Sequence, residues 1–182
     1  MIELRFHGRG GQGSVIASKV LASALFKEGK HVQAFPVFGV ERRGAPVTAF
    51  LRLDDKPIYL RCEVYNPDHI IVLDQTLVGV TDITAGLKEG GLILINTEKS
   101  PADFPEFSRF RVATVDANAI AIRHNLGSKT QPIVNTAILG SLARTSQLVR
   151  LESVIEAIRE SITLSTEENA KAAREAYESV SM

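Results

Sequence analysis

A glycine-rich segment, His7–Ser14, constrains this chain more than any other feature. It follows a short apolar run at 2–6 that predicts a strand, and it precedes apolar residues at helical spacing over 12–27 that predict a helix. Gly8, Gly10 and Gly13 fill a Gly-x-Gly-x-x-Gly pattern. Between a strand and a helix, this pattern indicates a site for an anionic ligand.

Two physical properties favour a phosphate at this segment. Glycines let the backbone approach a ligand closely, and the first N–H groups of a helix have no partner within it. Arg9 adds a positive charge whose planar fork matches a phosphate. The alternative is a glycine turn that only packs the helix tightly on the strand.

A nicotinamide dinucleotide does not fit this pattern. That ligand needs an acidic residue about 20 residues further on, at the end of the second strand, to hold a ribose hydroxyl. The second strand is predicted over 31–35 and ends at Pro36 without an acid, since Glu28 precedes it and Glu41 follows the next turn. A free-standing nicotinamide dehydrogenase is therefore disfavoured.

The composition limits the class of protein. With 182 residues, the chain predicts a single domain over 1–182, and its zero net charge gives no support for binding to nucleic acid or membrane. Residues 1–61 nevertheless carry ten Lys and Arg against five Asp and Glu, which suits an anionic ligand. Cys62 is the only cysteine, and no apolar run reaches 18 residues, so we expect a cytoplasmic protein without a membrane anchor.

A second loop is predicted at 36–46, where two prolines and two glycines enclose Glu41, Arg42 and Arg43. In an open parallel sheet this loop would lie beside the glycine segment, where both arginines could reach a phosphate or a partner's carboxylate, or where Glu41 could neutralise one of them. The apolar residues around the charges favour a contact surface over a solvated turn.

The remaining pattern predicts an α/β fold, a Rossmann-like, mostly parallel twisted sheet flanked by helices. An antiparallel hairpin is expected at one edge, formed by 47–53 and 58–60. Asp116 and Ser165 are predicted to begin helices, the latter through a capping box with Glu168. Further strands are expected at 69–73, 92–95 and 111–115. Helices are expected within 76–89, from 116 to Gly127 and over 151–162. Two more follow residues 131–135 and 165–168, and they end at about 148 and 179.

No set of catalytic side chains or metal ligands is recognisable by spacing, so the pattern is typical of a binding protein. His7 could bond a ligand or could merely end a strand. Asp74, at the end of a predicted strand, could bind a ligand or could cap the turn that follows it.

Three blocks together resemble the gamma subunit of 2-oxoacid:ferredoxin oxidoreductases, the pyruvate synthase family. The blocks are Phe6–Gly13, Gln33–Pro36 continuing through Gly39–Pro46, and Asn66-Pro67-Asp68 followed by Ile70–Asp74. Residues 135–140 and the acidic final helix are also similar to the family, so the likeness extends over nearly the whole chain.

The resemblance implies an enzyme that oxidatively decarboxylates a 2-oxoacid, pyruvate in the first place, passes electrons to ferredoxin and forms an acyl-coenzyme A. It implies that thiamine diphosphate, Mg and iron–sulfur clusters lie on alpha, beta and ferredoxin-like delta partner subunits, and that this chain holds no metal and no catalytic residue. Coenzyme A is then the ligand of the glycine segment. The implied binding residues are Gly8, Arg9, Gly10, Gly11, Gln12, Gly13, Ser14, Arg42 and Arg43, with Gln131 and Asn135 as weaker candidates.

An alternative remains open at this point, namely a nucleotide-binding regulatory or scaffold module outside redox chemistry.

Overall fold

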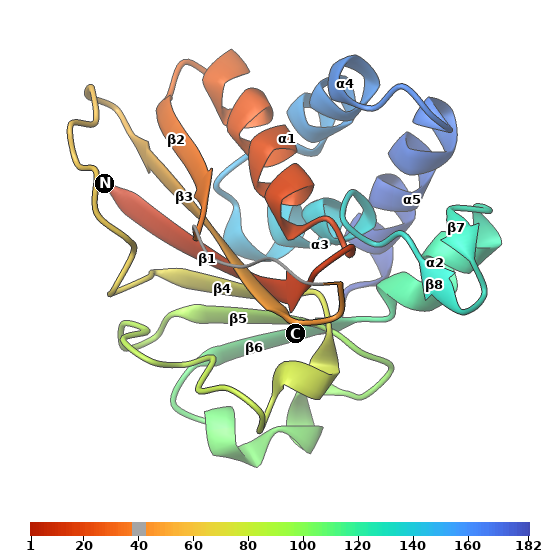
Figure 1. Ribbon diagram of the computed structural model, residues 1–182, viewed down its shortest axis with the longest axis horizontal. Coiled ribbons are helices and arrows are strands. Elements are labelled where there is room, and N and C mark those ends of the chain that lie inside the picture. The colour runs from red at the N-terminus through yellow and green to blue at the C-terminus, as the bar shows by residue number, and fades with distance from the viewer. Residues whose placement is uncertain (38–42) are drawn as a thin grey trace.

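The computed structural model describes residues 1–37 and 43–182 (Figure 1). Predicted residues Arg42 and Glu41 lie outside the described residues. The strands and helices, in chain order, are β1 (Ile2–Arg9), α1 (Ser14–Lys27), β2 (His31–Pro36), β3 (Pro46–Asp54), β4 (His69–Val72), β5 (Leu92–Asn96), β6 (Arg111–Val115), α2 (Ala117–Arg123), β7 (Gly127–Ser128), β8 (Gln131–Pro132), α3 (Ala137–Ser146), α4 (Leu151–Ser161) and α5 (Thr166–Ser179).

The predicted α/β fold with a mostly parallel sheet is confirmed. Six strands lie in the order β2-β3-β1-β4-β5-β6, and β1, β4, β5 and β6 are parallel neighbours. Only β3 runs against its neighbours, pairing antiparallel with both β1 and β2. The carboxyl ends of β1, β2 and β4 therefore meet at one edge of the sheet, where the predicted ligand loops emerge.

The predicted edge hairpin exists, but the prediction paired the wrong segments. It is formed by β2 and β3, while 58–60 forms no strand. Residues 49–53 of β3 are all buried. Because both edges of β3 are occupied, by β1 and by β2, no edge of this strand remains for a second arm.

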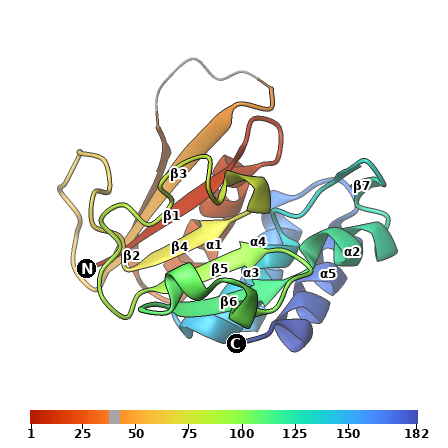
Figure 2. The same ribbon diagram turned by 90° about the horizontal axis from the view of Figure 1, so that it is seen from below.

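Two layers cover the sheet (Figures 1 and 2). Helices α1 and α3 pack against one face of the sheet, α4 packs on α1 and α5 on α3, and their apolar side chains form the larger core. Loops and short 3₁₀ turns cover the other face of β4, β5 and β6 with a smaller apolar cluster that includes Leu77, Phe104 and Phe107. The sheet is thus buried on both faces near its centre, as continuous apolar strands require.

The helix predicted within 76–89 does not form. The segment contains a 3₁₀ turn, Gln75–Leu77, and turns in which Gly79 and Gly86 adopt positive φ of 89° and 72°. A Cβ at Gly86 would lie 1.9 Å from the Tyr65 carbonyl oxygen. The turn therefore packs directly against the backbone of Tyr65, and a helix could not occupy this position.

The two predicted helix caps have different outcomes. Asp116 caps α2 as expected, because its carboxylate accepts a hydrogen bond from the Ala119 N–H at 2.8 Å. The capping box at Ser165 is wrong, since Ser165 has φ 51° and its side chain makes no cap bond. The Asn169 side-chain amide instead donates to the Ser165 carbonyl at 2.8 Å, so a residue inside α5 fixes the start of this helix.

The contact between α3 and α5 supplies a stability test. A Cβ at Gly140 would lie 1.8 Å from the Ala173 carbonyl oxygen. Alanine normally favours a helix over glycine, but here we expect Gly140→Ala to lower the free energy of unfolding by about 1–3 kcal/mol through overpacking. Urea unfolding measures the change.

Lys171→Ala is the matched control, because Lys171 lies on the exposed face of α5. It should change the stability by no more than about 0.5 kcal/mol. A Gly140→Ala protein as stable as the wild type would show that the two helices are not in close contact.

Candidate functional site

The glycine segment turns from the end of β1 into α1 through conformations that require glycine. Gly11 and Gly13 have positive φ of 96° and 82°. At Gly8, an added Cβ would lie 2.2 Å from the Ser14 hydroxyl oxygen. The predicted strand, loop and helix are therefore confirmed, although β1 continues to Arg9, three residues beyond the predicted strand, and α1 begins at Ser14, two residues after the predicted start.

Two predicted ligand residues have a structural role in this loop. The Gln12 side chain accepts a hydrogen bond from the Arg9 N–H at 2.7 Å and donates to the Asp74 carboxylate at 2.8 Å. The Arg9 guanidinium forms an ion pair with the same Asp74 oxygen at 3.2 Å and donates to the Thr76 hydroxyl. Arg9 and Gln12 thus tie the loop to the end of β4.

Asp74 is the anion at the centre of this network. Burial raises its pKa, but hydrogen bonds from Thr76 and Gln12 outweigh burial and hold the pKa below its ordinary value. The carboxylate therefore stays ionised at neutral pH. Asp74 also caps the following 3₁₀ turn by accepting from the Thr76 N–H, so the cap predicted from the sequence is confirmed and is one of two roles.

The second predicted loop lies against the first, as expected. The Gly10 N–H donates to the Ala45 carbonyl at 2.8 Å, and the Gly44 N–H donates to the Gly10 carbonyl at 3.0 Å. Arg43, the residue before Gly44, forms a β-bridge with Gly10, and its guanidinium donates to the Gln131 side chain at 2.8 Å. Arg43 and Gln131, both predicted as candidates, thus contact each other.

These residues border a cleft of about 590 Å³. One wall is formed by 9–12 and 43–44, and the opposite wall by the β7–β8 hairpin and the residues up to Val134, with Asn118 also lining it. Asn118, Ser128 and Thr130 are lining residues that the sequence prediction missed. Asn118 lies just beyond the carboxyl end of β6, so the rule that identified the loop after β1 could have identified it.

The start of α1 presents donors directly after the wall residues 9–12, although residues 13–16 do not themselves line the cleft. Ala17 is the first residue whose N–H bonds back along the helix, to the Gly13 carbonyl at 2.9 Å. Within the described chain, the N–H groups of 14–16 have no partner, and Gly13 offers no side chain to cap them. Uncapped amides at a helix N-terminus favour an anion.

Two buried polar atoms next to the loop also lack partners in the described ranges. They are the Ser14 hydroxyl oxygen and the Asn135 Oδ1. Both residues are at least nine-tenths buried, and the Asn135 Nδ2 lies 2.3 Å from the position that a Cβ on Gly13 would occupy. Since buried polar groups are normally hydrogen-bonded, these atoms indicate that the loop is built to receive a further polar group.

His7 does not line this cleft. Its ring is buried, and its Nε2 accepts a hydrogen bond from the Arg5 Nε at 3.0 Å. Burial, together with the neighbouring Arg5 charge, lowers the pKa of His7 to about 3. The ring is therefore neutral at physiological pH and serves as an acceptor that orients Arg5.

Comparison with known proteins identifies the family. The family model described as pyruvate ferredoxin/flavodoxin oxidoreductase matches residues 3–179. This chain belongs to that family. A relative from Thermococcus kodakarensis, the pyruvate/ketoisovalerate oxidoreductases common subunit gamma, is 57% identical over 181 residues, which cover 97% of this chain and 96% of the relative.

Two further relatives support the gamma assignment within the family. The pyruvate synthase subunit PorC of Methanothermobacter marburgensis is 51% identical over 98% of this chain and 97% of that protein. The crystal structure of the pyruvate oxidoreductase subunit PORC from Thermotoga maritima superposes with a TM-score of 0.84 at 38% identity, covering 98% and 96%. The predicted resemblance to gamma subunits is confirmed, and the alternative of a module outside redox chemistry loses its support.

Among the described residues, every helix is too short or too polar to span a membrane. In residues 1–37 and 43–182, no three His, Cys, Asp or Glu side chains gather as metal ligands.

The lowered pKa of His7 predicts a pH dependence of stability. The unfolded chain binds a proton at His7 below about pH 6.5, whereas the folded chain does so only near pH 3, so stability falls as the pH decreases through this window. His7→Gln keeps an acceptor but does not titrate. Between pH 7 and 5, the variant should lose about 2 kcal/mol less unfolding free energy than the wild type.

Urea unfolding at the two pH values measures this difference. His31→Gln is the control, because His31 is exposed at the start of β2, and it should keep the wild-type dependence. Equal pH dependence of His7→Gln and the wild type would contradict a buried, neutral His7.

Proposed function

We propose that this chain binds coenzyme A for a 2-oxoacid:ferredoxin oxidoreductase, with the phosphates in the cleft between the glycine segment and the β7–β8 hairpin. The observation that carries the proposal is the uncapped start of α1 beside two loops that join at Gly10 and place Arg9 and Arg43 in one cleft wall. Amide donors and guanidinium groups are the usual partners of phosphates.

The two described arginines contribute differently. Arg9 already pairs with Asp74, so part of its charge is neutralised within the chain. Arg43 is exposed, and its partner among the described residues is the neutral Gln131 amide. Among the described residues, Arg43 has no ion-pair partner, so it supplies positive charge at the mouth of the cleft, and Arg9 mainly shapes the loop.

The cofactors of the reaction belong on partner subunits in this proposal. An iron–sulfur cluster does not fit the donor set of this chain, because Cys62 is its only cysteine and such clusters usually need four thiolates. We assign thiamine diphosphate, Mg and the clusters to alpha, beta and ferredoxin-like delta subunits in the cytoplasm. Ferredoxin accepts the electrons there.

We propose pyruvate as the principal oxoacid, and we place its binding outside this chain. The Thermococcus relative is named as common to pyruvate and ketoisovalerate oxidoreductases. A gamma subunit that two oxidoreductases share suits a role in binding coenzyme A, because both reactions use it. The choice of oxoacid is then left to other subunits.

Arg43→Gln tests the charge of the cleft in the assembled enzyme. We expect the KM for coenzyme A to rise about tenfold, since a charge-assisted hydrogen bond contributes about 1.5–3 kcal/mol and part of it is screened at this exposed site. The KM for pyruvate should not change. Steady-state reduction of a viologen dye at varied coenzyme A measures both constants.

The control is Lys19→Gln, which removes the same charge from the exposed face of α1 away from the loop. It should leave both constants at their wild-type values. A change in the pyruvate KM alone, or equal effects of the two variants, would overturn the assignment of coenzyme A to this cleft.

Ser14→Ala distinguishes a ligand contact from a packing role. The Ser14 hydroxyl is buried without a partner in the described part of the chain, so its removal should leave the unfolding free energy unchanged or slightly higher. If it donates to a coenzyme A phosphate, affinity should fall about tenfold.

Thermal unfolding and calorimetric titration of the assembled enzyme with coenzyme A measure the two quantities. Ser179→Ala, at the exposed end of α5, is the control. Wild-type affinity in Ser14→Ala would exclude this hydroxyl from the site.

A further inference from the structure

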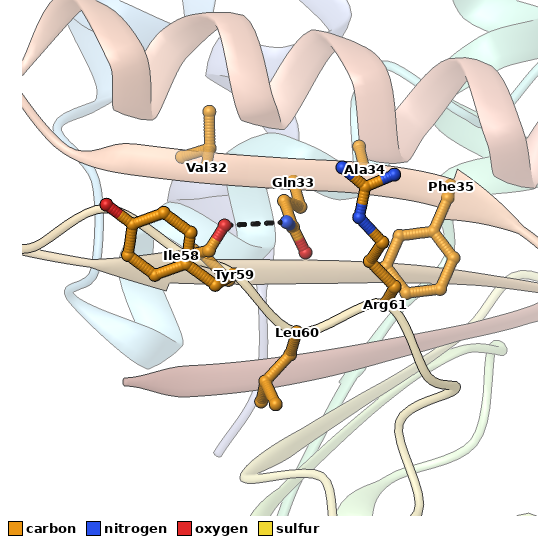
Figure 3. A pocket seen from close by; sticks show the side chains of 8 residues that line it. All are labelled: Val32, Gln33, Ala34, Phe35, Ile58, Tyr59, Leu60 and Arg61. Atoms are coloured by element: carbon orange, nitrogen blue, oxygen red, sulfur yellow. Dashed lines mark hydrogen bonds between the residues drawn. The ribbon is translucent and has the colours of Figure 1, made fainter.

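A second concave surface lies at the free edge of the sheet, away from the cleft. Strand β2 forms this edge, and the segment 58–61 crosses in front of the neighbouring β3 (Figure 3). Between β2 and this segment is a groove of about 660 Å³, lined by Val32–Phe35 and Ile58–Arg61. The Gln33 side chain donates to the Ile58 carbonyl at 3.0 Å and holds the segment in place.

The backbone of β2 offers unused hydrogen-bonding groups along its free edge, next to this groove. The Val37 N–H donates to the Thr48 carbonyl at 2.9 Å, and in an antiparallel ladder such bonds recur at every second residue. The groups of 33 and 35 therefore face β3, and those of Val32 and Ala34 face outward. Within the described chain these outward groups have no partner.

Apolar side chains gather along the same groove. Tyr59 and Leu60 line it and are 85% and 46% exposed, and Phe35 lines it as well (Figure 3). Exposed apolar side chains next to an open strand edge favour association with another polypeptide.

The charge of the groove indicates what this polypeptide carries. Arg61 is exposed and makes no ion pair or hydrogen bond to the described residues, whereas nearby Lys30 is paired with Asp55 at 2.5 Å. Two copies of this chain joined at β2 would bring their Arg61 side chains toward one another. A carboxylate on a different chain would be attracted instead.

We propose that an extended segment of another subunit of the oxidoreductase adds as a strand to β2. Its backbone pairs with Val32 and Ala34, an aliphatic or aromatic side chain fills the groove, and a carboxylate pairs with Arg61. The proposal rests on membership of a multisubunit enzyme family, and it does not depend on where coenzyme A binds.

Arg61→Glu tests the charge pairing in the co-expressed enzyme. We expect at least tenfold less of the variant chain to be recovered with the tagged partner subunits. Lys56→Glu makes the same charge reversal on the exposed turn outside the groove, and it should assemble like the wild type.

Ala34→Pro is the second variant, because proline removes an N–H that β3 does not use. It should reduce recovery while thermal unfolding shows a folded chain. Normal assembly of both variants would overturn the proposal. So would a concentration-dependent dimer of the isolated chain that Arg61→Glu abolishes, because the occupant would then be a second copy.

Discussion

The ionised Asp74 carboxylate holds the candidate site together. It lies at the carboxyl end of β4, beside the end of β1, and it binds both Arg9 and Gln12 of the glycine segment. The parallel pairing of β1 with β4 brings a residue 62 positions away from Gln12 into contact with the loop. Without this anion, the loop would carry a half-buried amide with one hydrogen bond fewer and a guanidinium with no counter-charge.

The position of the glycine segment determines how the second loop and the β7–β8 hairpin are placed at this edge of the sheet. Because Gln12 and Arg9 are bound on the side of Asp74, the loop carbonyl and amide of Gly10 are free to pair with residues 44 and 45. That pairing positions Arg43 across from the β7–β8 hairpin. The positive charge of Arg43 and the uncapped amides of α1 thus lie at the same edge of the sheet, beside the cleft to which we assign coenzyme A.

Much of this arrangement is predictable from local sequence, and the errors have physical causes. The turn at Gly10–Gly13 and the cap at Asp116 depend on neighbouring residues, so these predictions were confirmed. Strand β1 continues three residues beyond the predicted strand, because it pairs with β3 as far as Arg9. The partner of β3 depends on long-range pairing, and the sequence alone suggested 58–60 in place of β1 and β2. The roles of Arg9 and Asp74 also required the folded sheet, because an ion pair between them cannot be recognised from spacing.

The central claim is that coenzyme A binds with its phosphates between the glycine segment and the β7–β8 hairpin. A structure of the assembled oxidoreductase with coenzyme A tests it most directly. We predict phosphate oxygens within hydrogen-bond distance of the amides that begin α1 and of the Arg43 guanidinium. Coenzyme A bound with its phosphates on another subunit, and with this cleft left to solvent, would contradict the account.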